Sequence, residues 1–301
     1  MADQAQAEPL DPALLSEDAG RASTAFPPTH SIGYGEPIFT GINRIGLWSL
    51  YIKEVRRFLK VQTQTIWGPA VSTILFLIIF DVALGRGDRT VLGVGFSDFL
   101  APGLIMMAIM QNAFANSSFS LLAGKIQGTI IDLLMPPLSI GELMTGIVGA
   151  AITRGVLVGA ALALAILLYP GAQLHFAHGW AIAWFGLMGA AMLSLLGLLT
   201  SIWAEKFDHN AAVSTLVIAP LALLSGTFYT IDRLSGAFEV ISRFNPFFYV
   251  ISGFRYGFLG QSDIGEGSGA VVQAAIGLGV FNACLALGVY ALLRSGWKLK
   301  S

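Results

Sequence analysis

The sequence contains few charged residues for its length. Asp, Glu, Lys and Arg make up 12% of its 301 residues, and 55% of the residues are hydrophobic, whereas soluble domains carry about 25% charged residues. This composition excludes an ordinary soluble domain and indicates an integral membrane protein. The 17 basic and 18 acidic residues nearly balance, and no strongly basic region stands out, so no nucleic-acid partner is expected.

Cysteine is almost absent. The single Cys284 excludes an intrachain disulfide and a thiolate metal cluster, and because it lies in an apolar run we expect a small buried hydrophobe. His175 and His178 lie three residues apart in a loop, but no nearby carboxylate or cysteine completes a ligand set, so no metal is expected.

The sequence also lacks a phosphate-binding loop. The pair Gly124-Lys125 has Phe119 where the first glycine of a P-loop is needed and Ile126 where Ser or Thr is needed. No nucleophile stands with both a base and an orienting group. We therefore expect no catalytic activity and no cofactor bound by this chain.

The N-terminal part divides into a tail and a helix. Residues 1–40 hold scattered acidic residues among Ala, Pro, Ser and Gly, which predicts a disordered cytoplasmic tail rather than a signal peptide. Residues 42–65 predict an amphipathic helix at the membrane surface that contacts anionic lipid, although a solvated charged face would give the same pattern. Its basic stripe, at helical spacing, consists of Lys53, Arg56, Arg57 and Lys60.

Six apolar segments of about 20 residues or more follow, each long enough to cross a ~30 Å hydrocarbon core. Eleven Lys and Arg residues fall on the side that holds both termini, against five on the other side. The positive-inside rule therefore predicts that both termini are cytoplasmic. Within the domain 66–301, the predicted spans are 66–85, 99–121, 141–169, 179–203, 211–230 and 269–293.

A polar break separates the second and third spans. The apolar residues from Lys125 to Met135 recur at helical spacing, which predicts about three turns of amphipathic helix over residues 125–136, stopped by Pro136-Pro137. Ser139 is placed to cap the next helix together with Glu142. An ordinary cytoplasmic loop is the alternative interpretation.

The connection 231–268 is too long for a tight turn and too apolar for a solvated loop. Ser235–Phe244 and Pro246–Leu259 each have helical length. Two short helices that re-enter the outer leaflet, or two that lie flat on the outer surface, would both fit this pattern.

Polar residues within the spans are few. Arg154 lies ~20 Å along the third span from Gly141 and serves either to anchor helices or to act on a substrate or gate. Asn112 and Asn116 belong to a polar run in the second span that either bonds neighbouring helices or lines a pathway.

Three stretches together resemble the permease subunit of an ABC-2 type exporter. The first reads G-T-x-x-x-L-L-x-x-P-L-S-x-x-E-L from Gly128 to Leu143. The second comprises A-E-K-F-D-H-N at 204–210 and A-P-L-A-L-L-S-G-T-F-Y at 219–229, and the third reads N-P-F-F-Y-V-I-S-G-F-R-Y-G-F-L-G at 245–260. The resemblance runs from about Trp48 to the C-terminus. It departs from the family pattern at Ser252 and near Ile130, where acidic residues are expected.

The resemblance implies an all-α membrane domain of six helices, preceded by the interfacial helix. The polar break would be the coupling helix that docks into a separate cytoplasmic ATPase, which would carry ATP and Mg. The coupling contacts would then be Lys125, Gly128, Thr129, Asp132, Leu133, Leu134 and Pro137. The outer motif would contribute Asn245, Pro246, Phe247, Tyr249 and Arg255.

The resemblance further implies a homodimer in the bacterial inner membrane that carries two ATPase copies. The first, second and fifth spans would line the pathway, with Asn112, Asn116, Leu223, Leu224, Thr227 and Phe228 as candidates for the pathway or gate. The substrate would be an amphipathic drug or a lipid-like molecule, or alternatively a lipid-linked glycan. The competing classes are a secondary transporter or channel, which would depend on a proton gradient, and a structural scaffold, with which no ATPase would copurify.

Overall fold

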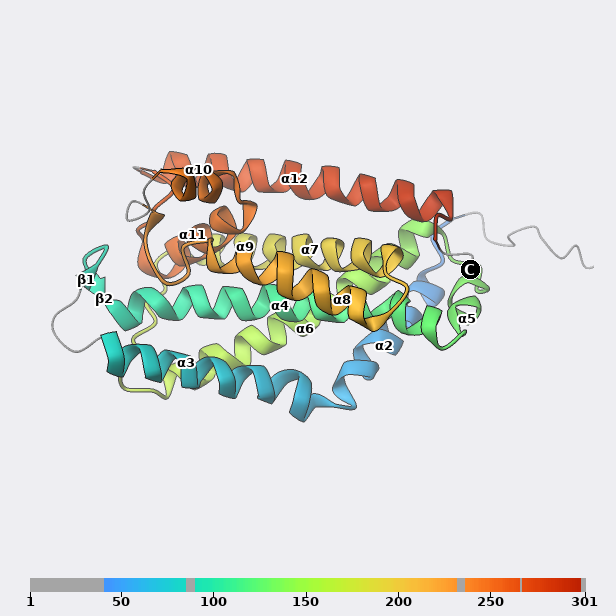
Figure 1. Cartoon of the computed structure of the whole chain (residues 1–301), viewed down its shortest axis with the longest axis horizontal. Coiled ribbons are helices and arrows are strands. Elements are labelled where there is room, and N and C mark those ends of the chain that lie inside the picture. The colour runs from blue at the N-terminus through green and yellow to red at the C-terminus, as the bar shows by residue number, and fades with distance from the viewer. Residues whose placement is uncertain (1–40, 85–89, 232–235, 266, 299–301) are drawn as a thin grey trace, which may run out of the picture. The chain divides into compact units, whose positions relative to one another are not determined.

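The computed structural model describes residues 41–84, 90–231, 236–265 and 267–298, so the predicted tail over residues 1–40 lies outside the described residues. The predicted all-α fold is confirmed: apart from a short antiparallel hairpin, the regular elements described are helices (Figure 1). In chain order they are α2 (Arg44–Leu59), η2 (Thr63–Trp67), α3 (Gly68–Leu84), β1 (Thr90–Val91), β2 (Val94–Gly95), α4 (Phe96–Ile126), α5 (Ile130–Leu134), α6 (Ile140–Leu167), α7 (Gly179–Trp203), α8 (Phe207–Val213), η3 (Ser214–Ile218), α9 (Ala219–Leu223), α10 (Ala237–Phe244), α11 (Pro246–Leu259) and α12 (Ser268–Ser295).

Within the described residues, five helices are long and apolar enough to cross a membrane. They match the predicted first, second, third, fourth and sixth spans, and are Thr63–Ala83, Phe96–Ile126, Ile140–Leu167, Gly179–Trp203 and Ser268–Ser295. The predicted fifth span, 211–230, is wrong in its bounds, because the apolar helical segment runs from Phe207 to Leu223 and is shorter. It ends there because the chain turns at Gly226, which has a φ of 73°, and the Tyr229 hydroxyl donates to the Leu223 carbonyl (3.1 Å).

Close contact between α4, α6 and α7 forms the centre of the helical unit. A Cβ at Gly197 on α7 would lie 2.6 Å from the Phe114 carbonyl oxygen on α4, and a Cβ at Gly155 on α6 would lie 2.7 Å from the Ile109 carbonyl oxygen on α4. These glycines let the backbones approach as closely as small residues do in membrane helix pairs. Figure 1 shows α12 on one side of these helices and α3 on the other.

The peripheral helices expose apolar faces. Cys284 lies on the outward face of α12 and is exposed, so the prediction of a buried cysteine is wrong. The apolar run around it is a surface that faces lipid or another chain, because in a membrane protein apolar sequence does not require burial inside the protein. Phe76 and Ile79 on α3 are exposed in the same way.

The polar break differs from the predicted three-turn helix. α4 continues to Ile126, the chain turns at Gly128 with a φ of 71°, and α5 is a single turn, Ile130–Leu134. The prediction over residues 125–136 is therefore wrong in its bounds, because Ile126 and Ile130 keep helical spacing across a break between two helices. The predicted start of the next helix is confirmed, since Ser139 and Glu142 form a capping box at the first turn of α6.

The two predicted short helices are present as α10 and α11. A Cβ at Gly189 on α7 would contact Val250 on α11, and a Cβ at Gly257 on α11 would contact Ile182 on α7. α11 thus runs antiparallel to the first ~15 Å of α7, rather than across its end, and is largely buried. This position favours the re-entrant alternative over a flat surface helix. Figure 1 shows α10 and α11 at the same end as the hairpin, opposite α5.

Candidate functional site

The corner formed by α5 and the start of α6 is tied to the start of α2. The Glu142 carboxylate accepts from the backbone amides of Ser139 (2.6 Å) and Asn43. Asn43 in turn caps α2 through Gly46 (2.9 Å) and donates from its side chain to the Pro137 carbonyl (3.3 Å). The corner and the start of α2 are therefore joined directly by hydrogen bonds. Sequence reasoning missed Asn43, whose signal is a polar residue immediately before an amphipathic helix.

The corner presents most of its predicted contact residues to the outside. Leu133 of α5 is buried, and the side chain of Leu134 lies outside the described part of the structure. Two large apolar side chains that sequence reasoning did not select, Ile131 and Met135, are 61% and 75% exposed. An exposed apolar pair on a polar loop is typical of a protein-binding surface. The exposed predicted residues are Gly128, Thr129, Asp132 and Pro137.

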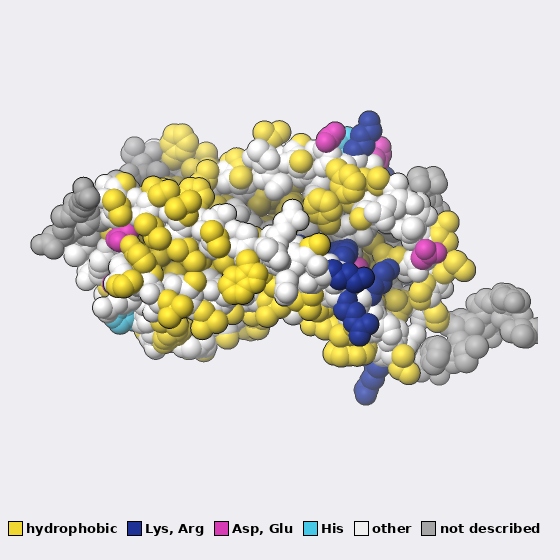
Figure 2. Space-filling model, turned by 90° about the horizontal axis from the view of Figure 1, so that it is seen from below, with side chains coloured by type: hydrophobic (Ala, Val, Ile, Leu, Met, Phe, Trp, Pro, Cys, Tyr) yellow, Lys and Arg dark blue, Asp and Glu magenta, His cyan; other side chains and the backbone are white. Residues whose placement is uncertain are grey.

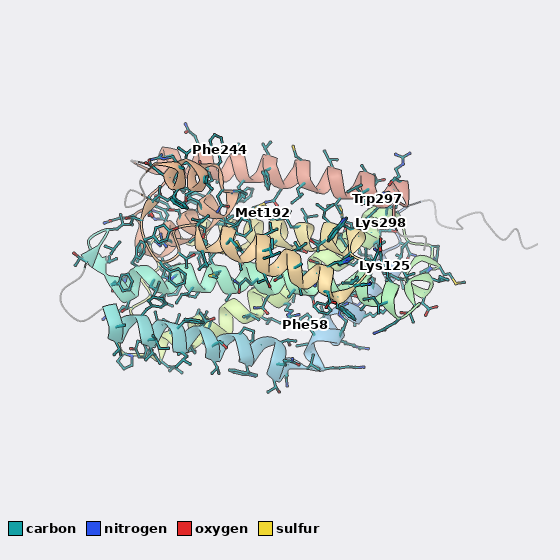
Figure 3. All side chains as sticks on the ribbon, viewed as in Figure 1. Phe58, Lys125, Met192, Phe244, Trp297 and Lys298 are labelled. Atoms are coloured by element: carbon teal, nitrogen blue, oxygen red, sulfur yellow. The ribbon has the colours of Figure 1, made fainter. Side chains whose placement is uncertain are left out.

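Lys125 is not presented by the corner. Its ammonium group donates to the Ile202 carbonyl (2.5 Å) and the Ala204 carbonyl (3.1 Å), so it caps the C-terminus of α7. Beside it, Lys298 donates to Glu205 (2.8 Å), and this hydrogen bond holds the pKa of that carboxyl below its usual value. Figure 3 shows Lys125 and Lys298 close together at one end of the helices. Lys125 thus joins α4 to α7.

The four cations of the basic stripe on α2 fall into two groups. Lys53, Arg56 and Lys60 are exposed, as expected for a helix that faces lipid headgroups. Arg57 instead pairs with Glu54 (2.9 Å) and donates to the carbonyl oxygen of Asn116 on α4 (2.9 Å). Figure 2 shows Lys and Arg side chains gathered in one patch, in the region where Figure 1 shows α2.

A cavity of about 440 Å³ opens between α3, α4 and the α9 segment. Of the predicted pathway residues, the structure brings Asn112, Leu223 and Phe228 together in its wall, and the ring of Phe228 lies 5.1 Å from that of Phe80 on α3. Gln111, an exposed polar residue at the middle of α4, also lines it. The remaining apolar lining includes Phe76, Leu104, Met107 and Ala108. The wall is therefore mainly apolar with two amides and the hydroxyls of Ser72 and Thr73, as in sites that bind amphipathic small molecules.

The other predicted pathway residues lie elsewhere. Thr227 is fully buried in the turn after α9, where its hydroxyl donates to the Ala222 carbonyl (3.4 Å). Leu224 lies in the same turn and is half-buried. Asn116 is buried against Arg57. These three residues do not line the cavity.

Arg154 lies level with α2. The neighbouring Thr153 hydroxyl and the Tyr51 hydroxyl of α2 are hydrogen-bonded (2.8 Å), and Arg154 donates to the Asn112 side-chain oxygen (3.2 Å). Arg154 thus lies beside the helix that is predicted to lie at the membrane surface.

The outer motif holds α11 in place. Asn245 caps α11 through the amide of Phe247 (3.0 Å) and donates to the Leu221 carbonyl (2.7 Å), while Pro246 occupies the first turn. Phe247 is buried, and the Tyr249 hydroxyl donates to the Arg243 carbonyl (2.9 Å). The motif therefore links the end of α9 to α11.

Arg255 lies at the centre of this motif. Its guanidinium is fully buried, pairs with Asp263 (3.4 Å), donates to the Gly226 carbonyl (2.8 Å) and lies 3.8 Å from the centre of the Phe99 ring. Asp263 donates its amide to Ser252 (3.4 Å), the position where an acid was expected. In this chain the carboxylate that faces Arg255 is thus supplied by the loop after α11.

The family is shown by comparison with known proteins. Residues 46–259 match the family described as "ABC-2 type transporter". The chain belongs to this family. It is 34% identical over 258 residues to "Inner membrane transport permease YadH" of Escherichia coli (strain K12), covering 85% of this chain and 98% of that protein. It is 26% identical over 200 residues to "Nodulation protein J" of Rhizobium leguminosarum bv. viciae, covering 64% of this chain and 73% of that protein.

Membership of the ABC-2 family assigns the chain its general role. It is the transmembrane permease subunit of an ABC transporter and a multi-pass inner-membrane protein. An ABC ATPase is its implied partner. The corner, the cavity and the outer motif described above are therefore parts of a transport subunit.

Proposed function

We propose that this permease exports an amphipathic, drug-like or lipid-like molecule, driven by ATP that a separate ATPase hydrolyses. The observation that carries the proposal is the cavity between α3, α4 and α9, whose wall is aromatic and aliphatic but contains Gln111 and Asn112. A molecule with an apolar body and a polar group matches such a wall, whereas a small ion or a sugar would leave most of it unpartnered.

The corner formed by α5 and the start of α6 would transmit movement of the ATPase to the membrane helices. The exposed face of α5, with Ile131, Asp132 and Met135, would dock on the ATPase, which holds ATP and Mg. Since the corner is bonded to α2 through Glu142 and Asn43, closure of the ATPase would move α2 and α6 as one body. With the corner on the ATPase side, the described ends of the chain, near Asn43 and Lys298, would lie on the cytoplasmic side, as the positive-inside count predicts.

A homodimer with two ATPase copies would complete the transporter. The exposed apolar faces of α3 and of the α9 segment, including Leu75, Phe76 and Leu223, border the cavity. A second copy placed against these faces would close the cavity around a substrate. This arrangement also assigns Phe228 and Phe80, which lie at the cavity wall, to a gate between the two copies.

The test is transport by reconstituted vesicles that contain the permease and its ATPase. ATP added on the side of the ATPase should drive a fluorescent amphipathic dye across the bilayer away from that side. Asp132→Arg, on the exposed face of α5, should abolish most of this transport while the permease keeps its thermal stability. The matched control is Glu239→Arg, a half-buried acid on α10 at the other end that pairs with Arg243, and this variant should transport normally.

Two results would count against the proposal. ATP-independent movement of the dye that follows a proton gradient would indicate a secondary transporter. Full transport by Asp132→Arg with the ATPase still bound would remove α5 as the coupling element.

A further inference from the structure

The protein interior beside α2 contains a cluster of basic and amide side chains. The described residues neither compensate all of its positive charge nor accept from all of its hydrogen-bond donors. Arg57 is paired with Glu54, but no acidic side chain pairs with Arg154 among the described residues. Arg57 is also close enough to Arg154 for like-charge repulsion. Two cations thus face one carboxylate, which leaves one uncompensated positive charge.

Two buried donors in the same cluster have no acceptor in the described part of the chain. They are the Nε of Arg154 and the side-chain amide nitrogen of Asn116. Asn112 and Asn116 are one helical turn apart on α4, and each uses its side-chain oxygen to accept from an arginine (3.2 Å from Arg154 and 3.3 Å from Arg57). Buried donors without acceptors are costly and rare, so the cluster is chemically incomplete.

The cluster is continuous with the proposed pathway. Asn112, which accepts from Arg154, also lines the cavity between α3, α4 and α9. Arg57 is partly exposed, and the exposed cations of α2 lie beside it. The cluster therefore joins an apolar cavity to the basic surface of α2, the helix predicted to contact anionic lipid.

We propose that Arg154, together with Arg57 and Asn116, binds the phosphate group of an anionic amphiphile whose apolar part occupies the cavity. Phosphate fits because it brings negative charge and several acceptor oxygens to a fork of guanidinium donors. The inference rests on the proposed function, since it names the substrate class of the same cavity: anionic, phosphate-bearing amphiphiles rather than cationic ones.

The test measures lipid binding to the purified permease in detergent by native mass spectrometry, with neither ATP nor the ATPase present. Dioleoylphosphatidylglycerol is compared with dioleoylphosphatidylcholine, which has the same chains and a phosphate whose charge is offset by its own quaternary ammonium group. The wild type should prefer the anionic lipid by about 5- to 10-fold at one saturable site, as one unneutralised arginine with charge-assisted bonds implies. Arg154→Gln should reduce this preference to about 2-fold or less.

The matched control is Arg56→Gln, which removes one exposed cation from α2 and should keep the saturable site. If Arg154→Gln does not fold, Asn116→Leu removes one of the unpartnered donors and should weaken binding of the anionic lipid without a change in charge. Equal binding of the two lipids by the wild type, or an unchanged preference in Arg154→Gln, would overturn the proposal. Displacement of the lipid by millimolar inorganic phosphate would show that free phosphate is sufficient for binding. It would overturn the proposal that the ligand is an amphiphile. This assay involves no transport, so lipid binding can be observed when the export experiment fails. Export can likewise be observed when the lipid does not bind.

Discussion

Replacement of Arg255 by methionine tests whether the outer motif is held by one buried cation. The guanidinium has four partners: Asp263 at 3.4 Å, the carbonyl oxygens of Gly226 (2.8 Å) and Thr227 (3.4 Å), and the Phe99 ring at 3.8 Å. Methionine fills a similar volume but offers none of these interactions. It also removes the arginine that pairs with the Asp263 carboxylate, whose side chain is fully buried.

The expected loss follows from the burial of the pair. Removal of one partner of a buried ion pair costs about 3–5 kcal/mol, because the other charge stays in the interior. This corresponds to an increase of the unfolding equilibrium constant by about 10²-fold or more. The double variant Arg255→Met with Asp263→Asn removes both charges of the pair, so it should be more stable than the sum of the two single changes predicts.

The assay is unfolding of the purified permease in mixed micelles, titrated with denaturant and followed by tryptophan fluorescence. Arg243→Met is the matched control, because Arg243 is exposed and pairs with Glu239 on its own helix. This change should cost about 0–1 kcal/mol. A loss of less than about 1 kcal/mol for Arg255→Met, or additive effects in the double variant, would refute the view that this pair holds α11.

Three further predictions concern packing, the end of α7 and the cavity. Gly197→Ala places a methyl group against the Phe114 carbonyl and should destabilise the α4–α7 contact by about 1–3 kcal/mol. The control is Gly288→Ala, whose methyl group would meet no atom within 4 Å. This control should be neutral in the same unfolding assay. Lys125→Met should speed amide hydrogen exchange in the last turn of α7, because the carbonyls there lose their cap; unchanged exchange would show that water replaces it. Phe228→Ala should change the dye concentration at which the reconstituted transporter is half-saturated, and identical values for several dyes would exclude Phe228 from the pathway.

Local pattern was sufficient for much of the fold. Runs of apolar residues predicted the positions of five long helices, and the capping box of Ser139 and Glu142 and the bounds of α11 follow from residues within a few positions of each other. Such features depend on hydrogen bonds and side-chain spacing inside one segment, so the sequence specifies them. The segment 125–136 is the exception, because a helical spacing of apolar residues also arises when one helix ends and another begins at Gly128.

The sequence selected candidate pathway residues, but it did not predict which of them face the cavity. Of the pathway candidates, Asn112, Leu223 and Phe228 line the cavity, whereas Thr227 is enclosed in a turn. Whether a polar residue of a membrane helix faces a cavity or a neighbouring helix depends on the rotation of that helix against its partners. This rotation is set by packing contacts that no single segment contains.

The amino-acid sequence alone determines that the chain is a helical membrane protein, where its long helices lie, and that it has no P-loop of its own, because these properties depend on composition and on short-range spacing. Only the tertiary structure shows that Lys125 caps α7, that Arg255 pairs with Asp263, and that Arg154 lies level with α2 without a carboxylate among the described residues. A cation can reach several acceptors on different helices, and the one it binds is decided by which helices pack together.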